Sequence, residues 1–127
     1  MKTIYGLKVS KNGNIYKGLK RLKQIENKSG YLFVKFTYLR KPRKLFSHRL
    51  VALCYCRKPK NKKDLCVDHI DCNKQNNNAL NLRWVTYDQN FKYAIQNGLI
   101  PKGAKNRYKP RKRKSSLLKK VLVYAFK

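Results

Sequence analysis

The distribution of charge is the feature that most limits what this chain can fold into. It has 33 Lys and Arg against 5 Asp and Glu, a net charge of +28 in 127 residues. Such a charge opposes compaction by self-repulsion unless a polyanion neutralises it. Yet four of the five carboxylates gather in the window 64–88, which holds only two cations. One of the two histidines, His69, lies there between Asp68 and Asp71. A small acidic island inside a cationic chain needs an explanation.

The excess of cations points to an anionic partner. Nucleic acid fits best, because each phosphate that Lys or Arg neutralises releases condensed counterions. An anionic membrane is the competing partner, but the sequence shows no long amphipathic basic helix and no lipidation signal. No apolar run approaches the ~18 residues of a spanning helix, and the N-terminus lacks the apolar core of a signal peptide. We therefore expect a cytoplasmic protein, in a host cytoplasm if phage- or virus-encoded, that binds double-stranded DNA without a membrane or small-molecule cofactor.

Four cysteines raise the question of a structural zinc site. Their spacing is C-x-C, then nine residues, then C-x5-C, whereas structural zinc sites usually bring ligands in close C-x2-C pairs. The first two also fall in a predicted helix, where residues two apart point in different directions. Disulfides are rare in a reducing compartment. We expect four ordinary thiols and no structural zinc at Cys54, Cys56, Cys66 and Cys72.

The first half of the chain predicts antiparallel strands followed by a helix. Short apolar runs flank Asn12-Gly13, a pair that favours the positive φ angles of a type I′ hairpin turn. The run 31–38 is the clearest strand, since its residues are β-branched or aromatic and alternate in polarity. Ser47 is a predicted N-cap for a helix reaching about Cys56. His48, without an acidic neighbour in sequence, is expected to be structural or to make polar contacts.

A cationic turn at 40–43 is predicted to join the strand 31–38 to a returning strand at 44–46. A two-stranded ribbon with a basic tip can enter the major groove of DNA. The charge of the whole chain favours this reading over a merely solvated tip. The expected DNA-contacting residues here are Lys35, Arg40, Lys41, Arg43 and Lys44.

Residues 64–98 predict a ββα unit. Short strands at 65–67 and 82–85 are separated by an Asn-rich stretch unsuited to a strand or helix interior. Thr86 and Gln89 then fit a capping box for a helix to about Asn97, with Gly98 at its C-terminal cap. Trp84 is expected in the core of this unit. The fold class is therefore α+β.

Residues 101–127 carry eleven cations and no acid. Two prolines and a glycine favour an extended arm that follows phosphates without reading sequence. The cluster expected to contact DNA is Arg111, Lys112, Arg113 and Lys114. Whether residues 121–126 form a strand stays open. The expected organisation is an N-terminal DNA-contacting module at 1–63, a ββα unit at 64–98 and a basic arm at 99–127.

The acidic island has the residues that phosphodiester hydrolysis needs. Histidine suits the base role because an unperturbed imidazole titrates at about 6.5, near working pH. A carboxylate oxygen on Asp68 and an amide oxygen on Asn90 are hard ligands appropriate to Mg²⁺ or Mn²⁺. In a ββα hairpin the end of the first strand lies against the helix, so Asp68 and Asn90 can converge on one ion with His69 directed to the phosphate. Asp71 is expected to hold the loop, and Asp88 to favour the helix dipole.

Three segments carry a resemblance to a known family. Val-Asp-His-Ile-Asp at 67–71, Asn-Leu-Arg-Trp-Val-Thr at 81–86 and the terminal Asn90 resemble the HNH endonuclease motif, in the subgroup of phage and intron-encoded homing endonucleases. Upstream runs at 8–16, 29–32 and 48–52 look like the N-terminal module of such nucleases, so the resemblance covers roughly 5–98. Related homing enzymes often continue into a helix-turn-helix domain, whereas this sequence ends at Lys127.

The resemblance implies a role for each motif position. His69 matches the general base, and Asn81 matches the middle residue, which pins the loop and orients the histidine. Asp68 and Asn90 match the ligands of a single divalent metal that bridges the scissile phosphate and the leaving oxygen. The N-terminal strands are implied to contact DNA.

Two other functions remain open from the sequence. A non-catalytic basic nucleic-acid-binding protein, ribosome-associated or packaging, explains the charge but not the acids around His69. A zinc-stabilised binding module predicts stoichiometric zinc. Nicking and double-strand cleavage also stay open, because a monomer with one site would nick one strand while a homodimer could cut both.

Overall fold

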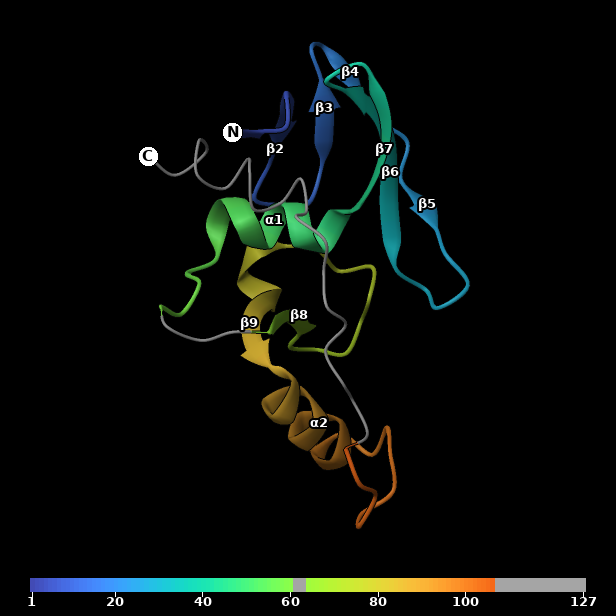
Figure 1. Cartoon of the computed structure of the whole chain (residues 1–127), viewed down its shortest axis with the longest axis vertical. Helices are drawn as coiled ribbons and strands as arrows, with labels where there is room; N and C mark the ends of the chain where they lie inside the picture. The colour runs from blue at the N-terminus through green and yellow to red at the C-terminus, as the bar shows by residue number, and fades with distance from the viewer. Residues whose placement is uncertain (61–63, 107–127) are drawn as a thin grey trace.

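The computed structural model describes residues 1–60 and 64–106 (Figure 1). It has the expected α+β architecture, with two small N-terminal sheets, a central helix and a C-terminal ββα unit. The boundary expected after residue 63 and the basic cluster Arg111–Lys114 lie outside the described residues. Within the described ranges, no helix is both long and apolar enough to cross a bilayer.

The first sheet is antiparallel and larger than expected, because strands flank the predicted hairpin on both sides. Its strand order is β1-β2-β3-β4. The outer strands are too short and too polar to show the alternation that identifies a strand in a sequence. The strands are β1 (Lys2–Ile4), β2 (Leu7–Val9), β3 (Ile15–Lys17) and β4 (Lys20–Arg21).

The turn between β2 and β3 differs from the predicted type I′. Val9 pairs with Ile15, so five residues form the loop. Gly13 has a φ of 90°, but Asn12 is not among the residues with positive φ. The amide of Gly13 donates to the carbonyl of Ser10 at 3.1 Å, and that of Ser10 donates to the carbonyl of Asn14 at 2.9 Å. The hairpin and the ends of its strands are as predicted, whereas the turn type is wrong, because the loop has five residues and only Gly13 of the Asn12-Gly13 pair has a positive φ.

The second sheet contains the predicted hairpin, with β6 (Leu32–Tyr38) central between β5 (Ile25–Glu26) and β7 (Lys41–Phe46). Tyr38 pairs with Lys41, so the turn consists of Leu39 and Arg40 alone. Both have positive φ, 53° and 62°, as a type I′ turn requires. The expected turn at 40–43 is therefore wrong in its bounds, because residues 41–43 already pair in β7.

Helix α1 (Ser47–Tyr55) lies at the centre of the molecule and joins the sheets to the ββα unit (Figure 1). Its residues Leu50, Val51 and Ala52 are fully buried. The predicted N-cap is wrong: Phe46 is the N-cap, and Ser47 is the first helical residue, with a buried hydroxyl that has no partner among the described residues. The core around this helix contains residues from the N-terminal sheets and from the ββα unit, from Ile4 to Leu82.

The ββα unit forms as predicted. Strands β8 (Leu65–His69) and β9 (Leu82–Thr86) pair in antiparallel register, with the short 3-10 helix η1 (Ala79–Asn81) before β9. Helix α2 (Tyr87–Gln96) starts with the predicted capping box of Thr86 and Gln89. It ends at Asn97 as C-cap, and Gly98 follows with a φ of 71°. Trp84 is only half-buried, and its Nε1 donates to the carbonyl of Ala52 at 3.3 Å.

Candidate active site

The ββα unit brings the predicted chemical residues to one cleft of about 510 Å³. Asp68 and His69 lie at the end of β8, and Asn90 lies in the first half of α2. The cleft also receives residues of the N-terminal half, from the loop before β6 and from the first turn of α1. Its polar lining includes Tyr31, His48, Arg49, Asp68, His69, Lys74, Tyr87 and Asn90.

The orientation of His69 is fixed by a hydrogen bond from its ring. His69 is 6% exposed, and its Nε2 lies 2.8 Å from Oδ1 of Asn77. An amide oxygen only accepts, so this contact is a hydrogen bond in the tautomer with the proton on Nε2, which leaves the lone pair of Nδ1 free. A neutral imidazole with one nitrogen held in this way has the form that a general base needs.

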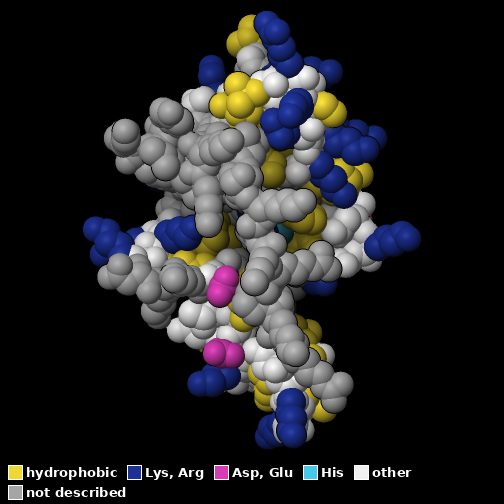
Figure 2. All heavy atoms as spheres, in the orientation of Figure 1, with side chains coloured by type: hydrophobic (Ala, Val, Ile, Leu, Met, Phe, Trp, Pro, Cys, Tyr) yellow, Lys and Arg dark blue, Asp and Glu magenta, His cyan; other side chains and the backbone are white. Residues whose placement is uncertain are grey.

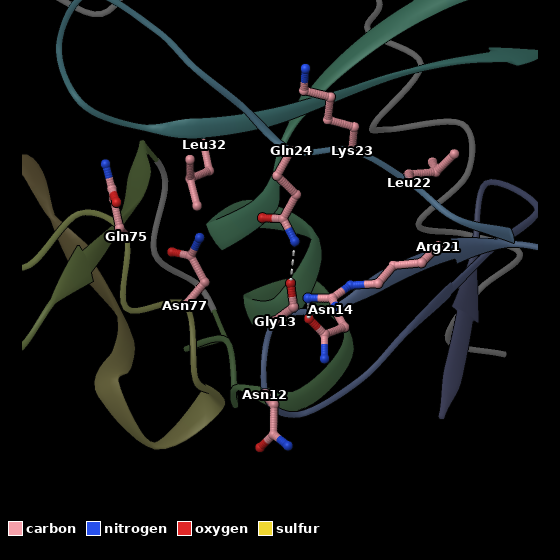
Figure 3. A pocket seen from close by; sticks show the side chains of 10 residues that line it. All are labelled: Asn12, Gly13, Asn14, Arg21, Leu22, Lys23, Gln24, Leu32, Gln75 and Asn77. Atoms are coloured by element: carbon pink, nitrogen blue, oxygen red, sulfur yellow. Dashed lines mark hydrogen bonds between the residues drawn. The ribbon is translucent and has the colours of Figure 1, made fainter.

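Asn77 itself is held by the N-terminal module. It is 4% exposed and packs against the β2–β3 turn, where a Cβ added to Gly13 would lie 3.0 Å from both the Cβ and the carbonyl oxygen of Asn77. The next contact along the chain is the amide of Ala79, which donates to the carbonyl of Lys11 at 2.8 Å. Figure 3 shows Asn77 beside Gly13 and Gln24, at the edge of a polar groove of about 530 Å³. Sequence reasoning missed Asn77, because nothing in the run Asn76–Asn78 distinguishes one amide from the next.

Asn81 holds the loop between β8 and η1. Its Nδ2 donates to Oδ1 of Asp71 at 2.8 Å and to the carbonyl of Asn76 at 2.9 Å. Its Oδ1 accepts from the amide of Asp71 at 3.1 Å. Hydrogen bonds from Asn76, Asn73 and Asn81 hold the pKa of Asp71 below its ordinary value. Asn81 therefore pins the loop, as its motif position implies, while the direct contact with the histidine ring comes from Asn77.

Asp68 is oriented by an arginine of the neighbouring strand. Nε and Nη2 of Arg83 both lie 2.9 Å from Oδ2 of Asp68, and the guanidinium stacks 3.8 Å over the ring of Tyr93. Within the described residues Oδ1 of Asp68 accepts no hydrogen bond from a side chain. The side chain of Asn90, which lines the same cleft, has no hydrogen-bond partner there either. One carboxylate oxygen and one amide oxygen fit a hard divalent ion that completes its coordination with water and phosphate.

The described residues hold no cluster of three His, Cys, Asp or Glu side chains suited to a metal. The four cysteines of the chain are free thiols, and their burial ranges from buried Cys54 to exposed Cys72. Burial raises the pKa of Cys54 to about 11, so its thiol stays protonated at neutral pH.

His48 lies directly against the candidate base, which the sequence did not indicate. The ring centroids of His48 and His69 are 5.1 Å apart, and Tyr31 lies 5.1 Å from the first and 6.0 Å from the second. Burial, with smaller contributions from His69 and Arg49, lowers the pKa of His48 to about 3. Its Nδ1 is buried without a partner in the described residues. His48 is therefore a neutral ring that packs against His69 in the same cleft and adds no charge beside it.

Two cations at the cleft were also missed. Arg49 follows His48 in α1 and lines the cleft. Lys74 reaches across from the loop, where its Nζ donates to the carbonyl of Ser29 at 2.8 Å and lies 4.8 Å from the ring centroid of Tyr31. Arg49 lies 20 positions before His69 and reaches it only through the fold, whereas Lys74 lies five positions after His69, in the loop that follows β8. They give the cleft the positive charge that attracts a phosphate.

The expected DNA-contacting residues of the first half lie on the β6–β7 hairpin and do not line the cleft. All except Arg43 are exposed, and Arg43 donates through Nε to the carbonyl of Tyr38 at 3.3 Å. Lys44 lies 4.1 Å from the ring centroid of Phe33. These residues are Lys35, Arg40, Lys41, Arg43 and Lys44.

Comparison with known proteins finds relatives that are all endonucleases. The HNH endonuclease family matches residues 46–92. Two uncharacterised HNH endonucleases of Acanthamoeba polyphaga mimivirus are 38% and 42% identical, over 69% and 58% of this chain and 27% and 19% of their own length. The DNA endonuclease I-HmuI of Bacillus phage SP01 is 37% identical over 72% of this chain and 53% of the relative. The chain thus spans about half or less of the length of the curated relatives it matches.

The fold gives the same result. The solved structure described as DNA binding and cleavage by the HNH homing endonuclease I-HmuI matches with a TM-score of 0.68 and 36% identity, over 75% of this chain and 55% of that one. The agreement covers the N-terminal sheets as well as the motif, since residues 46–92 alone are too short for it. By motif, relatives and fold, the chain is similar to HNH endonucleases, and its residues 46–92 match the HNH endonuclease family.

Proposed function

We propose that this chain is a metal-dependent DNA endonuclease in which His69 activates water. The observation that supports this best is the state of His69: a buried imidazole, held at Nε2 by Asn77, beside a carboxylate and opposite an amide in a cationic cleft. I-HmuI, to which the chain is similar, is a DNA endonuclease. The excess of 33 cations over 5 acids supports duplex DNA as the substrate.

The proposed chemistry is hydrolysis of one phosphodiester bond. Nδ1 of His69 takes a proton from water while the water oxygen forms a bond to phosphorus. The bond from phosphorus to the 3′ oxygen breaks, and that oxygen leaves with the electron pair and is then protonated. A divalent ion on Asp68 and Asn90 supplies, when bound, positive charge to the phosphate and the leaving oxygen.

Other residues of the cleft assist through position and charge. Arg83 engages only Oδ2 of Asp68, so it fixes the carboxylate and leaves Oδ1 as the oxygen that would hold an ion. Arg49 and Lys74 attract and orient the DNA backbone near His69. The neutral ring of His48 packs against the ring of His69 in the cleft and adds no charge beside it.

A supercoiled-plasmid assay with Mg²⁺ or Mn²⁺ tests the proposal. The chain should convert the plasmid to nicked or linear DNA, and a chelator should stop the reaction. His69→Ala and Asp68→Asn should each reduce the rate by at least ~100-fold while DNA binding persists. Asp64→Asn is the matched control, because Asp64 is an exposed carboxylate of the same segment that does not line the cleft.

Two results would contradict the mechanism. Undiminished cleavage by His69→Ala would remove the histidine from the chemistry. Tight DNA binding without cleavage under any divalent metal would instead indicate a non-catalytic nucleic-acid-binding protein. The conversion of supercoiled to nicked or linear plasmid also answers whether one strand or both are cut.

A further inference from the structure

Two hairpin tips carry leucines that the fold leaves in solvent. Leu19, in the turn between β3 and β4, is 101% exposed, and Leu39, in the turn between β6 and β7, is 64% exposed. Both tips lie at the same end of the molecule, far from α2 (Figure 1). The hairpins are also tied together, since Nζ of Lys17 donates to the carbonyl of Thr37 at 3.3 Å. The leucines therefore belong to one surface, which we call the tip surface.

The charge of the tip surface fits a polyanion. Its neighbouring side chains are cations, and residues 1–25 and 27–63 contain no Asp or Glu. On the face seen in Figure 2, apolar and Lys or Arg side chains gather at this end without an acid among them. The cations closest in sequence to the two leucines are Lys17, Lys20, Arg21, Arg40 and Lys41. A protein surface as partner would require acids concentrated on the other molecule, whereas duplex DNA has the matching charge along its whole length.

The turn at Leu39 holds two residues in a strained backbone conformation. A two-residue turn with positive φ at both positions favours Asn-Gly, because side chains with a Cβ are strained there. Here Leu39 and Arg40 occupy these positions, with φ of 53° and 62°. Neither residue suits the turn, so the side chains they present are not explained by the geometry of the hairpin. Strained positions of this kind often mark functional contacts.

We propose that Leu19 and Leu39 contact thymine methyl groups in the major groove and give the chain a preference for A·T base pairs. A two-stranded ribbon fits the major groove, and the C5 methyl of thymine is the apolar group exposed there. The cations on either side hold the tips against the phosphates, while the leucines distinguish the bases. The inference rests on the proposed function only in taking DNA as the ligand. It does not depend on cleavage.

Replacement of thymine by uracil tests the proposal, because uracil keeps every hydrogen-bonding group and lacks only the methyl. The full chain is mixed, with chelator present, with a random-sequence duplex pool prepared with dTTP and a competing pool prepared with dUTP. Burial of one methyl group contributes about fourfold in affinity, so two contacts predict a preference of about 15-fold for the thymine pool. The Leu19→Ala/Leu39→Ala variant should bind both pools equally, with the affinity that the parent shows for uracil DNA.

Controls separate this effect from general losses. Leu80→Ala removes an equally exposed leucine, 90% exposed, on η1, and should keep the full preference. Leu39→Asn suits the positive φ of the turn and should lose only the contribution of Leu39, about fourfold of the preference, while the hairpin is retained. Equal binding of both pools by the parent would overturn the proposal, as would a double variant that still prefers thymine. Plasmid cleavage dependent on His69 would stand in either case, so the two proposals fail separately.

Discussion

A buried histidine can act as a base only if one ring nitrogen is kept free of a proton. In this chain the free nitrogen is Nδ1 of His69, because Nε2 is held by Oδ1 of Asn77 at 2.8 Å. The motif position of Asn81 explains the shape of the loop, but the ring is oriented by a residue outside the motif. The side chain of Asn81 thus bonds to the carbonyl of Asn76, and the next residue, Asn77, contacts the ring of His69.

Asn77→Ala should impair catalysis more than DNA binding. Without the acceptor, the ring of His69 exchanges tautomers and rotates, and loss of such an orienting partner costs about 100-fold or more in rate. Single-turnover cleavage across pH should show a lower plateau, and nitrogen NMR of the imidazole should show mixed tautomers. Asn12→Ala is the matched control, since Asn12 is an exposed amide of the same polar groove. A normal rate and a single tautomer in Asn77→Ala would remove this role.

His48 should make the fold sensitive to acid. Its pKa is about 3 in the folded chain and about 6.5 when unfolded, so the unfolded state binds the extra proton between these values. Stability is therefore full above pH ~6.5 and falls as the pH falls toward 3, with a slope of at most about 1.4 kcal/mol per pH unit from this group. Urea unfolding from pH 7 to pH 4 measures it. His48→Phe keeps a ring among its aromatic neighbours and should flatten the curve; an identical slope would assign the acid sensitivity to other groups.

At the scale of elements, the N-terminal hairpin supports the active-site loop. The β2–β3 turn packs against Asn77 through Gly13, and Lys11 accepts a hydrogen bond from Ala79. The N-terminal strands are expected to face DNA, and Asn77 orients the candidate base. The β2–β3 turn thus connects the two by direct contact. This contact joins residues more than 60 positions apart and leaves no trace in local sequence patterns.

Gly13→Ala should destabilise the chain more than Gly18→Ala. Both glycines have positive φ, 90° and 60°, so each substitution incurs the backbone strain of about 1–2 kcal/mol. Only at Gly13 does the added Cβ meet atoms, 3.0 Å from Asn77, while nothing lies within 4 Å at Gly18. The difference in urea midpoint between the two variants isolates the clash. Gly13→Ala should also lower the cleavage rate, and equal effects of both variants would show that the turn does not support the loop.

The elements that the sequence predicted well are those with local signals. The capping box of Thr86 and Gln89, the alternating strand 31–38 and the ββα order were all readable from neighbouring residues. The cap of α1 and the bounds of the turn at 40–43 were wrong, because packing moved these boundaries by one to three residues. In the site, the motif residues were readable, whereas His48 and Arg49 reach the cleft only through the tertiary fold. Asn77 contacts the ring of His69 from outside the cleft, and no local pattern marks it.

At the scale of the whole molecule, a small candidate active-site cleft stands apart from most of the cations of the chain. The window 64–88 holds four of the five acids, while the cations expected to bind DNA lie on the β6–β7 hairpin and in the segment 107–127. Affinity should therefore depend on residues that the chemistry does not use, and the contribution of each cationic group to phosphate binding can be read from the salt dependence of binding.

Two variants with the same loss of charge compare the groups. One replaces Arg111, Lys112, Arg113 and Lys114 by Gln, and the other replaces Lys35, Arg40, Lys41 and Lys44 by Gln. If all four cations of a set contact phosphates, the plot of log K against log salt flattens by about 3.6 units of slope. The C-terminal set should weaken binding to all sequences alike, whereas the hairpin set should also reduce discrimination between thymine and uracil DNA, because it alters the tip surface. Because both variants lose four charges, a salt slope that changes in only one of them assigns the phosphate contacts to that group of cations. An unchanged salt slope in the C-terminal variant would show that this segment does not engage DNA.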